Sequence, residues 1–256
     1  AETKQMLLYG LGDIHLDVVV SKLKSRFGTS VQLSEPKIAY RETIKKKVQV
    51  EGKHKKQSGG HGQYGHVKIE FSPGEEEGLT FTETIFGGSV PKNFHPAVEK
   101  GLLDSMQKGV LAGFPVVNLK ANLYDGSYHD VDSSEMSFKL AAGIAYREGL
   151  KIANPVILEP IGELKVSVPE NIVGDVIGDL NKRRGRVLGM SPDEMRKSYT
   201  VVEAEVPKSE MNDYTIALRA MSQGRGRYDY EILRYEEAPA QVAQKIIADA
   251  KKDAEA

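Results

Sequence analysis

Two polar segments contain the residues whose types and spacing could support chemistry. The first runs from Lys56 to Gly65 and holds four glycines in the seven positions from Gly59 onward. Glycine adopts backbone conformations that are closed to other residues, so the backbone of this segment could approach a ligand closely. The second runs from Asp125 to Glu135 and contains His129 among polar neighbours. Histidine beside carboxylates can serve in acid–base catalysis or in metal binding.

Each segment also has a plainer interpretation. The glycine-rich segment can be an ordinary hairpin connection, because glycine is common in turns. The group of His129, Asp130 and Asp132 can be a solvated turn, a metal site, or part of a small hydrolase that uses His129 and Asp130. No second histidine lies at ligand spacing and no paired nucleophile accompanies the group, so the sequence disfavours a metal site and a hydrolase.

Basic side chains form two local clusters in a chain whose formal net charge is −1. Residues 41–56 carry seven basic and two acidic side chains, and the second cluster comprises Lys182, Arg183, Arg184 and Arg186. Basic patches attract RNA phosphates whatever the base sequence. A run of lysines can equally be a solvated strand edge that discourages aggregation. Both interpretations stay open for the first cluster.

The composition is that of an ordinary folded protein. Its 256 residues, 40% hydrophobic and 28% charged, leave room for two or more small domains. No run approaches the ~20 apolar residues that a membrane helix needs, and no apolar stretch follows a basic start as in a signal peptide. The absence of cysteine excludes disulfides and thiolate metal sites, which is compatible with a cytoplasmic protein. We therefore expect a soluble, cytoplasmic chain with no membrane partner.

The first 36 residues read as part of a larger domain. Apolar residues between Leu7 and Phe27 predict a strand-like run and then an amphipathic helix, with another strand around Val31 to Leu33. Proline disfavours helix in the residue before it, so Ser34 to Pro36 marks a boundary. Because these elements have no preceding partner, we expect residues 1–36 to be the remnant of a domain.

Residues 37–158 predict one mixed domain that presents the two polar segments as loops. Strands are expected at residues 44–50, 66–71, 79–84 and 116–124, with helices at 97–108 and from 134 to just before Pro155. Ser133 or Ser134 can cap the start of the second helix. The second polar segment therefore leads directly into a helix.

Residues 159–236 predict a second domain with the βαββαβ order of a ferredoxin-like fold. Strands are expected at residues 162–168, 186–190, 199–207 and 228–235, and helices at 171–183 and 211–221. A final helix, 240–250, follows Pro239. Such folds serve many functions, so the topology alone does not assign one.

Four segments in the right order resemble the elongation factor G family. Gly10-Leu11-Gly12-Asp13-Ile14-His15-Leu16-Asp17 resembles the Gly-Glu-Leu-His-Leu-Glu stretch of the family's third domain. The two polar segments match the loops at the tip of its fourth domain, and Met221-Ser222-Gln223-Gly224-Arg225-Gly226 resembles the signature near the end of its fifth. A glycine-rich string is weak evidence alone, but the four matches together span nearly the whole chain.

The resemblance implies an α+β, multidomain fold. Residues 1–36 would be the remnant of a ferredoxin-like third domain, and residues 37–158 a split β-α-β (ribosomal protein S5 domain 2-like) fourth domain that acts as an arm into the decoding site. Residues 159–236 would be the ferredoxin-like βαββαβ fifth domain, followed by a C-terminal helix at 237–256. This organisation agrees with the boundaries read from the residues.

The resemblance also implies a role on the ribosome as a monomer. The arm would enter the small-subunit acceptor site, and its tip would contact transfer RNA and messenger RNA as they translocate. His129 corresponds to the histidine that is modified in archaeal and eukaryotic relatives. The expected tip contacts are Gln57, Ser58, Gly59, Gly60, His61, Gln63, His129 and Asp130. The fifth domain's Lys182, Arg183, Arg184 and Arg186 would face large-subunit ribosomal RNA, so the partners include the RNA of both subunits.

One family feature is absent. The chain has no Gly-x-x-x-x-Gly-Lys-Ser/Thr phosphate loop, so we expect no nucleotide cofactor and no enzymatic activity in these residues. GTP and Mg would belong to a missing N-terminal domain of a translational GTPase. A naturally GTPase-free protein, and a ribosome-recycling or ribosomal-protection relative of the same architecture, stay as alternatives to a translocase.

Overall fold

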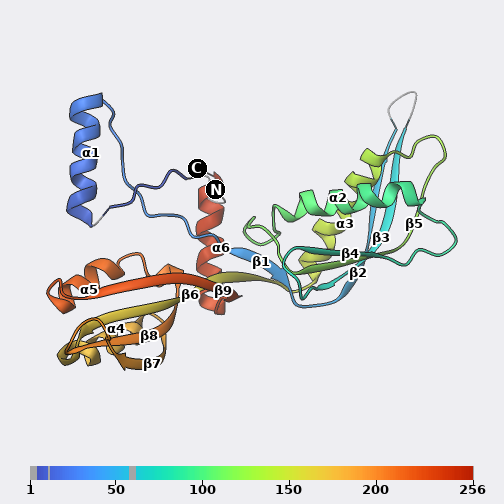
Figure 1. Ribbon diagram of the computed structural model, residues 1–256. Coiled ribbons are helices and arrows are strands. Elements are labelled where there is room, and N and C mark those ends of the chain that lie inside the picture. The colour runs from blue at the N-terminus through green and yellow to red at the C-terminus, as the bar shows by residue number, and fades with distance from the viewer. Residues whose placement is uncertain (1–4, 11, 58–61, 256) are drawn as a thin grey trace. The chain divides into compact units, whose positions relative to one another are not determined.

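The computed structural model describes residues 5–10, 12–57 and 62–255, and its chain forms two compact units (Figure 1). Unit 1 comprises residues 1–39 and 159–236, and unit 2 comprises residues 40–158 and 237–256. The predicted mixture of helices and sheets is confirmed. Within the described residues, no helix is both long enough and apolar enough to cross a membrane.

Unit 2 is built on a four-stranded sheet. Its strands are β2 (Val48–Lys56), β3 (Gln63–Pro73), β5 (Leu119–Ser127) and β4 (Leu79–Glu83), in that spatial order. Strands β2, β3 and β5 are antiparallel neighbours, whereas β4 runs parallel to β5. Helices α2 (His95–Met106) and α3 (Glu135–Ile152) pack on one face of the sheet (Figure 1). Alternate residues of β3 are buried, as expected for a sheet with one covered face.

Two glycines let helix α3 lie unusually close to the hairpin of β2 and β3. A Cβ atom on Gly52 would stand 2.1 Å from the backbone oxygen of Ala141, and one on Gly65 would stand 2.4 Å from that of Ser137. Any side chain at either position would push the helix away. The hairpin and the helix are therefore packed backbone to backbone, which fixes where α3 begins relative to the end of the hairpin.

The strand predicted at residues 44–50 is in fact two strands. Strand β1 (Arg41–Ile44) pairs with the first residues of β6 (Pro155–Pro169), and β2 starts only at Val48. The backbone N–H groups of Lys45 and Lys46 donate to the carbonyl oxygen of Ala153, 3.1 and 2.9 Å away. These bonds turn the chain between the strands, and the sequence pattern could not show them because Ala153 is remote.

A buried carboxylate anchors the connection after α2. Glu42, only 1% exposed, accepts N–H bonds from Leu111 (2.9 Å), Ala112 (2.9 Å) and Phe114 (3.1 Å). A buried charge is costly unless it is hydrogen-bonded, and three amide donors meet that need. Glu42 thus has a structural role in holding this connection.

Unit 1 contains the predicted ferredoxin-like order. After β6 come α4 (Val173–Lys182), β7 (Arg186–Pro192), β8 (Tyr199–Pro207), α5 (Tyr214–Ser222) and β9 (Arg227–Glu237). Strand β6 lies between β8 and β9, and β7 pairs with β8 at the edge. The apolar residues of β6 and β8 and those of both helices form one core. Short 3₁₀ turns lie at Lys92–Phe94, Glu170–Ile172 and Lys208–Glu210, and α6 (Ala240–Glu255) belongs to unit 2.

The N-terminal segment contains one helix, α1 (Asp13–Phe27), which ends at Gly28 in a left-handed conformation with φ of 65°. The predicted strand at residues 31–33 is wrong, because these residues belong to no helix or strand. Val31 and Leu33 are 40% and 46% exposed. Strand propensity alone does not form a strand where no pairing partner is present.

Candidate functional site

The hairpin of β2 and β3 carries the first polar segment at its end. The last paired residues are Lys56 and Gln63, and Gln57 follows as an exposed residue. Gln63 Oε1 lies 2.8 Å from His54 Nε2 on the neighbouring strand, so the Gln63 side chain has a local partner. The predicted contacts Ser58, Gly59, Gly60 and His61 lie outside the described residues.

Asp132 joins the second polar segment to the hairpin. Its side-chain oxygen Oδ1 accepts the backbone N–H of Gly62 at 2.9 Å, and its carbonyl oxygen accepts that of Tyr64 at 2.8 Å. A Cβ atom on residue 62 would stand 2.8 Å from Asp132 Oδ2, which explains glycine at this position. Two loops some seventy residues apart in sequence therefore form one surface, which we call the tip; it comprises residues 57, 62–64 and 128–134.

Ser133 fixes the turn that leads into α3. Its hydroxyl donates to the carbonyl oxygen of Tyr64 at 2.9 Å and accepts the backbone N–H of His129 at 2.9 Å. The next residue, Ser134, caps the helix by accepting the N–H of Ser137 at 3.2 Å, as the sequence predicts. The hydroxyl groups of Ser133 and Ser134 thus form hydrogen bonds to backbone groups on both sides of this turn.

The imidazole of His129 is held by backbone amides. Its Nδ1 accepts the N–H groups of Val131 and Asp132, at 3.3 and 3.2 Å. A nitrogen that accepts N–H donors carries no proton, so the neutral ring has its proton on Nε2. The side chain is 55% exposed, and its ring centroid lies 6.4 Å from that of Tyr64. The tip therefore presents an oriented N–H donor on a half-exposed ring.

A polar network lies directly behind the tip. Ser127 Oγ lies 2.7 Å from both the Tyr64 hydroxyl and His66 Nδ1. Next to it, Lys68 Nζ lies 2.7 Å from Asp125 Oδ2, and this hydrogen bond is the largest of several that lower the pKa of Asp125 to about 2. Asp125 stays ionised at every physiological pH, so its ion pair with Lys68 persists.

The basic residues of the hairpin have different environments. Lys45 and Lys47 form ion pairs with Glu237 and Glu70, each at 2.7 Å. Lys53 and Lys55 are exposed, with the Lys53 ammonium 5.8 Å from the centre of the Tyr64 ring. All four lysines are exposed, and Lys53 and Lys55 are the two nearest the tip.

The rival interpretation of His129 and Asp130 as a catalytic pair finds little support in the geometry. His129 Nδ1 accepts amide N–H groups, and the carboxylate nearest to it is that of Asp132 at 3.6 Å, not that of Asp130. Asp130 is exposed. Among the described residues, no three or more His, Asp or Glu side chains are arranged to hold a metal ion.

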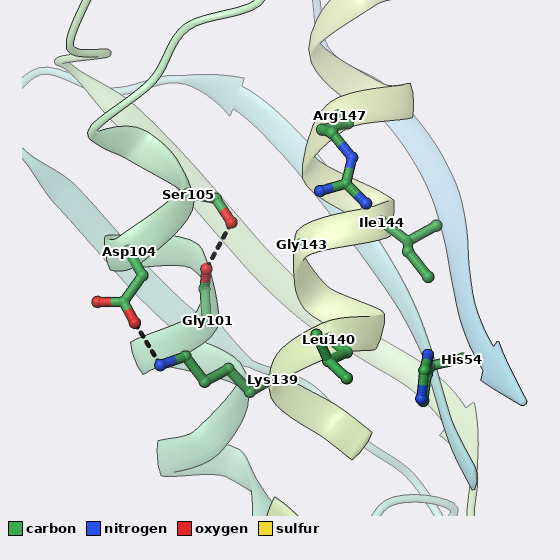
Figure 2. Close-up of a pocket in the computed structure, with 9 residues that line it drawn as sticks. All are labelled: His54, Gly101, Asp104, Ser105, Lys139, Leu140, Gly143, Ile144 and Arg147. Carbon is green, nitrogen blue, oxygen red and sulfur yellow. Dashed lines mark hydrogen bonds and ion pairs between the residues drawn. The ribbon is translucent and has the colours of Figure 1, made fainter. Parts of the chain in front are cut away.

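A surface pocket of about 300 Å³ lies elsewhere in unit 2, between α2, α3 and strand β2 (Figure 2). Its lining includes His54, Leu140 and Arg147, together with the ion pair of Lys139 and Asp104. None of the predicted tip residues that the structure describes lines it, although His54 of the lining bonds to Gln63 at 2.8 Å.

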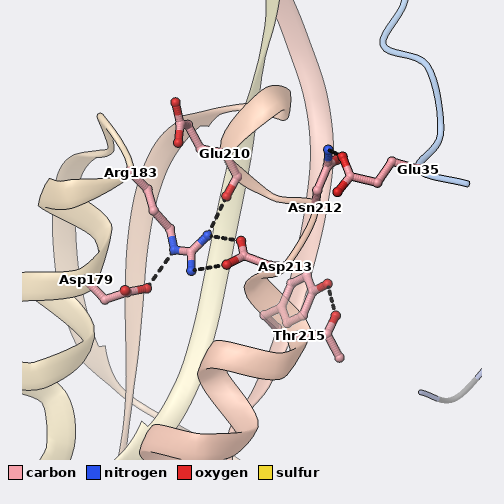
Figure 3. A network of polar contacts seen from close by, with 8 residues as sticks. Glu35, Asp179, Arg183, Glu210, Asn212, Asp213 and Thr215 are labelled. Atoms are coloured by element: carbon pink, nitrogen blue, oxygen red, sulfur yellow. Dashed lines mark hydrogen bonds and ion pairs between the residues drawn. The ribbon is translucent and has the colours of Figure 1, made fainter. Parts of the chain in front are cut away.

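The arginines predicted to face large-subunit RNA have internal partners in unit 1. Arg183 is 12% exposed; its Nε lies 2.7 Å from Asp179, and its Nη1 lies 2.7 Å from the Glu210 carbonyl oxygen and 2.5 Å from Asp213 (Figure 3). The same figure shows Asn212 bonded to Glu35 at 3.1 Å. These contacts make Arg183 a structural joint between α4 and the turn before α5.

Arg184 and Arg186 are also paired. Arg184 makes a two-pronged contact with Glu159, at 2.8 and 2.9 Å, and a further one with Glu210 at 2.9 Å. Glu159 is 3% exposed, so this pair is largely removed from water. Arg186 lies 2.5 Å from Glu205 but is itself 70% exposed. Lys182 is exposed, so Lys182 and Arg186 are the members of the cluster that face solvent.

Several residues of the tip have roles that the sequence did not reveal. Tyr64, Asp132 and Ser133 were part of the two polar segments, but nothing in their spacing showed that they bond to one another. Ser127 and His66 behind the tip gave no signal either. Their partners lie about sixty or seventy residues away, beyond the reach of any local pattern.

Comparison with known proteins identifies the same family along nearly the whole chain. Residues 1–35 match the family model for elongation factor G domain III, residues 36–154 that for domain IV, and residues 156–246 that for the elongation factor G C-terminus. Elongation factor G of Aquifex pyrophilus is 47% identical over 249 residues, which cover 97% of this chain and 35% of that protein.

A solved structure gives the same result for the fold. A crystal structure of a protein from Thermus thermophilus matches 98% of this chain with a TM-score of 0.88 and 45% identity, and the match covers 37% of that protein. The chain thus spans just over a third of the length of these two proteins.

Proposed function

The chain belongs to the elongation factor G family, and on this premise we propose that the tip of unit 2 promotes movement of transfer RNA and messenger RNA through the small ribosomal subunit. The observation that carries the proposal is the joining of two loops by Asp132 and Ser133. This joining presents the ring of His129 at a fixed orientation on an exposed polar surface.

The chemistry of the tip suits RNA of any sequence. Serine, amide and backbone groups bind phosphates, sugar hydroxyls and exposed base edges. A translocase has to accept every codon, so sequence-tolerant contacts are required. The proposed contacts are Gln57, Ser58, Gly59, Gly60, His61, Gln63, His129 and Asp130. Within this set, His129 Nε2 supplies a donor toward an RNA acceptor, while Nδ1 is occupied by the loop's own amides.

The proposed mechanism needs no covalent step in this chain. The tip would act by occupying a site and by hydrogen-bonding there, so that the RNA cannot move back. GTP hydrolysis with Mg would belong to a nucleotide-binding part of the complete protein, outside the regions matched here. Because ribosomes translate in the cytoplasm, we expect the chain to work there as a monomer.

We also retain the four-part division at 1–36, 37–158, 159–236 and 237–256 as a proposal. The boundaries at 36 and 158 are close to those of the matching family models. The compact units group these parts in pairs, the first with the third and the second with the fourth. For large-subunit RNA contact, Lys182 and Arg186 are the better candidates in the cluster, since Arg183 and Arg184 are engaged internally.

The test is a chimera in which this chain replaces the matched region of the Aquifex pyrophilus factor. His129→Ala removes the N–H donor, and we expect single-round translocation to slow about tenfold, as for loss of one hydrogen bond of ~1–1.5 kcal/mol in the rate-limiting step. Ribosome binding by sedimentation should be unchanged. Val131→Ala, at a 63% exposed residue of the same loop, is the matched control and should translocate normally.

Equal rates for His129→Ala and the unsubstituted chimera would contradict the proposal. A parallel loss of ribosome binding would also contradict it, because the tip would then contribute to affinity and not to movement.

A further inference from the structure

The pocket between α2, α3 and β2 is not used by the proposed function (Figure 2). Its volume of about 300 Å³ lies at the small end of the ~300–1,000 Å³ range of small-molecule sites. The α3 wall is a stripe of residues three and four positions apart, from Leu140 to Arg147, and such residues share one face of a helix. A second stripe, from Gly101 to Ser105, comes from α2, and His54 comes from β2.

Two glycines bring the helices together under this pocket. A Cβ atom on Gly101 would stand 2.6 Å from the backbone oxygen of Lys139, and one on Gly143 would stand 3.3 Å from Ser105 Oγ. The Ser105 hydroxyl donates to the carbonyl oxygen of Gly101 at 2.7 Å, so it is held against its own helix. The space that larger side chains would fill is therefore left open as part of the pocket.

One positive charge of the pocket is not neutralised. Lys139 pairs with Asp104, so these two charges cancel. The exposed Arg147 points back along α3 toward Gly143, where its Nη1 would lie 4.0 Å from an added Cβ (Figure 2). Among the residues that the structure describes, Arg147 bonds to no carboxylate. A planar guanidinium with free donors can bind a carboxylate or phosphate group through two parallel hydrogen bonds.

Apolar side chains lie beside this guanidinium. Leu140, 41% exposed, and Ile144 lie one turn apart on α3, and the ring of His54 faces them from β2 (Figure 2). An exposed ion pair alone contributes little, because water and salt screen it. Burial of an apolar body against Leu140 and Ile144 adds the favourable free energy that the charge does not supply. The pocket therefore favours a ligand that has both an anionic group and an apolar body.

His54 connects the pocket to the tip. Its Nε2 lies 2.8 Å from Gln63 Oε1. A carbonyl oxygen can only accept a hydrogen bond, so Nε2 carries the proton, and Nδ1 of the neutral ring is left for another partner. Gln63 is one of the proposed RNA contacts. A ligand that touches the ring of His54 therefore changes the surroundings of Gln63 through a single hydrogen bond.

We propose that this pocket binds a small organic anion, with its carboxylate or phosphate group on Arg147 and its apolar body against Leu140 and Ile144. The volume suits a ligand with one ring or a short chain. This site goes beyond the proposed function and does not rest on it, because its residues and charges are those of the helical face of unit 2 and not those of the tip.

The experiment follows the NMR signals of the whole chain during titration with benzoate and phenyl phosphate, which carry the two candidate anionic groups. Benzyl alcohol supplies the ring without the charge, and inorganic phosphate supplies the charge without the ring. Arg147→Gln removes the guanidinium. Lys245→Gln, at an exposed position of α6, makes the same charge change away from the pocket and is the matched control. Thermal unfolding checks that both variants are folded.

We expect the better of the two anionic probes to bind with a Kd on the order of 1 mM, which suits so small a ligand, and to identify the preferred anionic group. Arg147→Gln should weaken this binding about tenfold, whereas Lys245→Gln should leave it unchanged. Benzyl alcohol and inorganic phosphate should each bind at least about fivefold more weakly than the better probe. The side-chain amide signal of Gln63 should shift as the pocket fills.

Three results would overturn the proposal. The first is the absence of saturable binding by both anionic probes. The second is equal binding by the Arg147→Gln and Lys245→Gln variants, or by inorganic phosphate and the better probe, because the charge or the apolar body would then be irrelevant. The third is a titration that leaves Gln63 unmoved, because the probe would then lie away from His54.

The proposed function has a separate readout. His129→Ala should bind the probes normally, since His129 does not line the pocket. Loss of translocation and loss of probe binding are therefore measured with different variants, and either proposal can fail while the other stands.

Discussion

The tip of unit 2 and the arginine cluster of unit 1, defined as Arg183, Arg184 and Arg186, are both made of polar residues but use them differently. In the tip, side chains such as Asp132 and Ser133 bond to backbone groups, and the exposed ring of His129 is left facing outward. In the arginine cluster, the side chains bond to internal carboxylates such as Glu159. The residue types gave similar evidence in both places. Only the internal carboxylate partners distinguish the arginine cluster, a structural joint, from the proposed binding surface at the tip.

The sharpest test of this comparison is removal of a cluster arginine. Arg184→Ala would leave Glu159 buried without its charge partner, and we expect a loss of about 3 kcal/mol in the free energy of unfolding. Denaturant unfolding of the chain measures the loss. Lys182→Ala, at a neighbouring exposed position, should change stability by no more than about 0.5 kcal/mol. Similar values for both variants would mean that the cluster is not the structural joint described.

A second test concerns the scaffold of the tip. Gly65→Ala places a methyl group against the Ser137 carbonyl oxygen, and we expect a loss of about 2 kcal/mol from overpacking, with a disturbed start of α3. Gly174→Ala in α4 is the control, because a Cβ there meets nothing within 4 Å and should stabilise the helix by about 0.5–1 kcal/mol. Both values come from denaturant unfolding, and a stabilising Gly65→Ala would contradict the close packing.

A third test separates positioning from contact within the tip. Asp132→Ala breaks the side-chain link to Gly62 and removes the carboxylate near His129, but it keeps the backbone N–H that bonds to His129 Nδ1. We expect translocation by the chimera to fall about fivefold, from the loss of roughly 1 kcal/mol of orientation. Asp132→Asn keeps an acceptor oxygen and should restore most of the rate. If Asn and Ala variants are equally slow, the charge of Asp132 matters and not the link.

The smallest effect is expected in the acid stability of unit 1. The pKa of Glu205 is lowered from an ordinary value of 4.5 to about 2, chiefly by the hydrogen bond from Arg234. Burial acts in the opposite direction, and the hydrogen bond from Arg186 lowers the pKa further. A depressed carboxyl pKa stabilises the fold above pH 4.5, and that contribution disappears as the pH falls toward 2. Glu205→Gln should reduce the change in the free energy of unfolding between pH 4.5 and pH 2. A carboxyl titration followed by NMR with a midpoint near 4.5 would be inconsistent with the pairing.

The sequence predicted much of the fold because local patterns determine much of it. The order of elements in unit 1 and the cap at Ser134 both follow from periodicity and short-range hydrogen bonding. Local patterns failed where pairing decided the outcome. Residues 31–33 have strand character without a partner strand, and residues 44–50 were divided by bonds to Ala153.

The candidate site was predictable in outline but not in its construction. The glycines and His129 marked the two polar segments, because glycine backbone can approach a ligand closely and histidine can exchange a proton. The contact of Tyr64 with Ser133 spans 69 residues, and that of Arg183 with Asp213 spans 30. Contacts between residues so far apart in the sequence form only once the sheet has folded. The joining of the two loops and the pairing of the arginines with carboxylates could therefore not be predicted from the sequence.

The close contact of α3 with the hairpin at Gly52 and Gly65 gives unit 2 a mechanical property. A two-stranded hairpin alone bends easily. A hairpin in direct backbone contact with a helix is thicker, and resistance to bending rises steeply with thickness. A force applied at His129 would therefore be transmitted through the hairpin and the helix together, with little bending of either. A methyl group added at either glycine would force the helix and the hairpin apart and make unit 2 easier to bend.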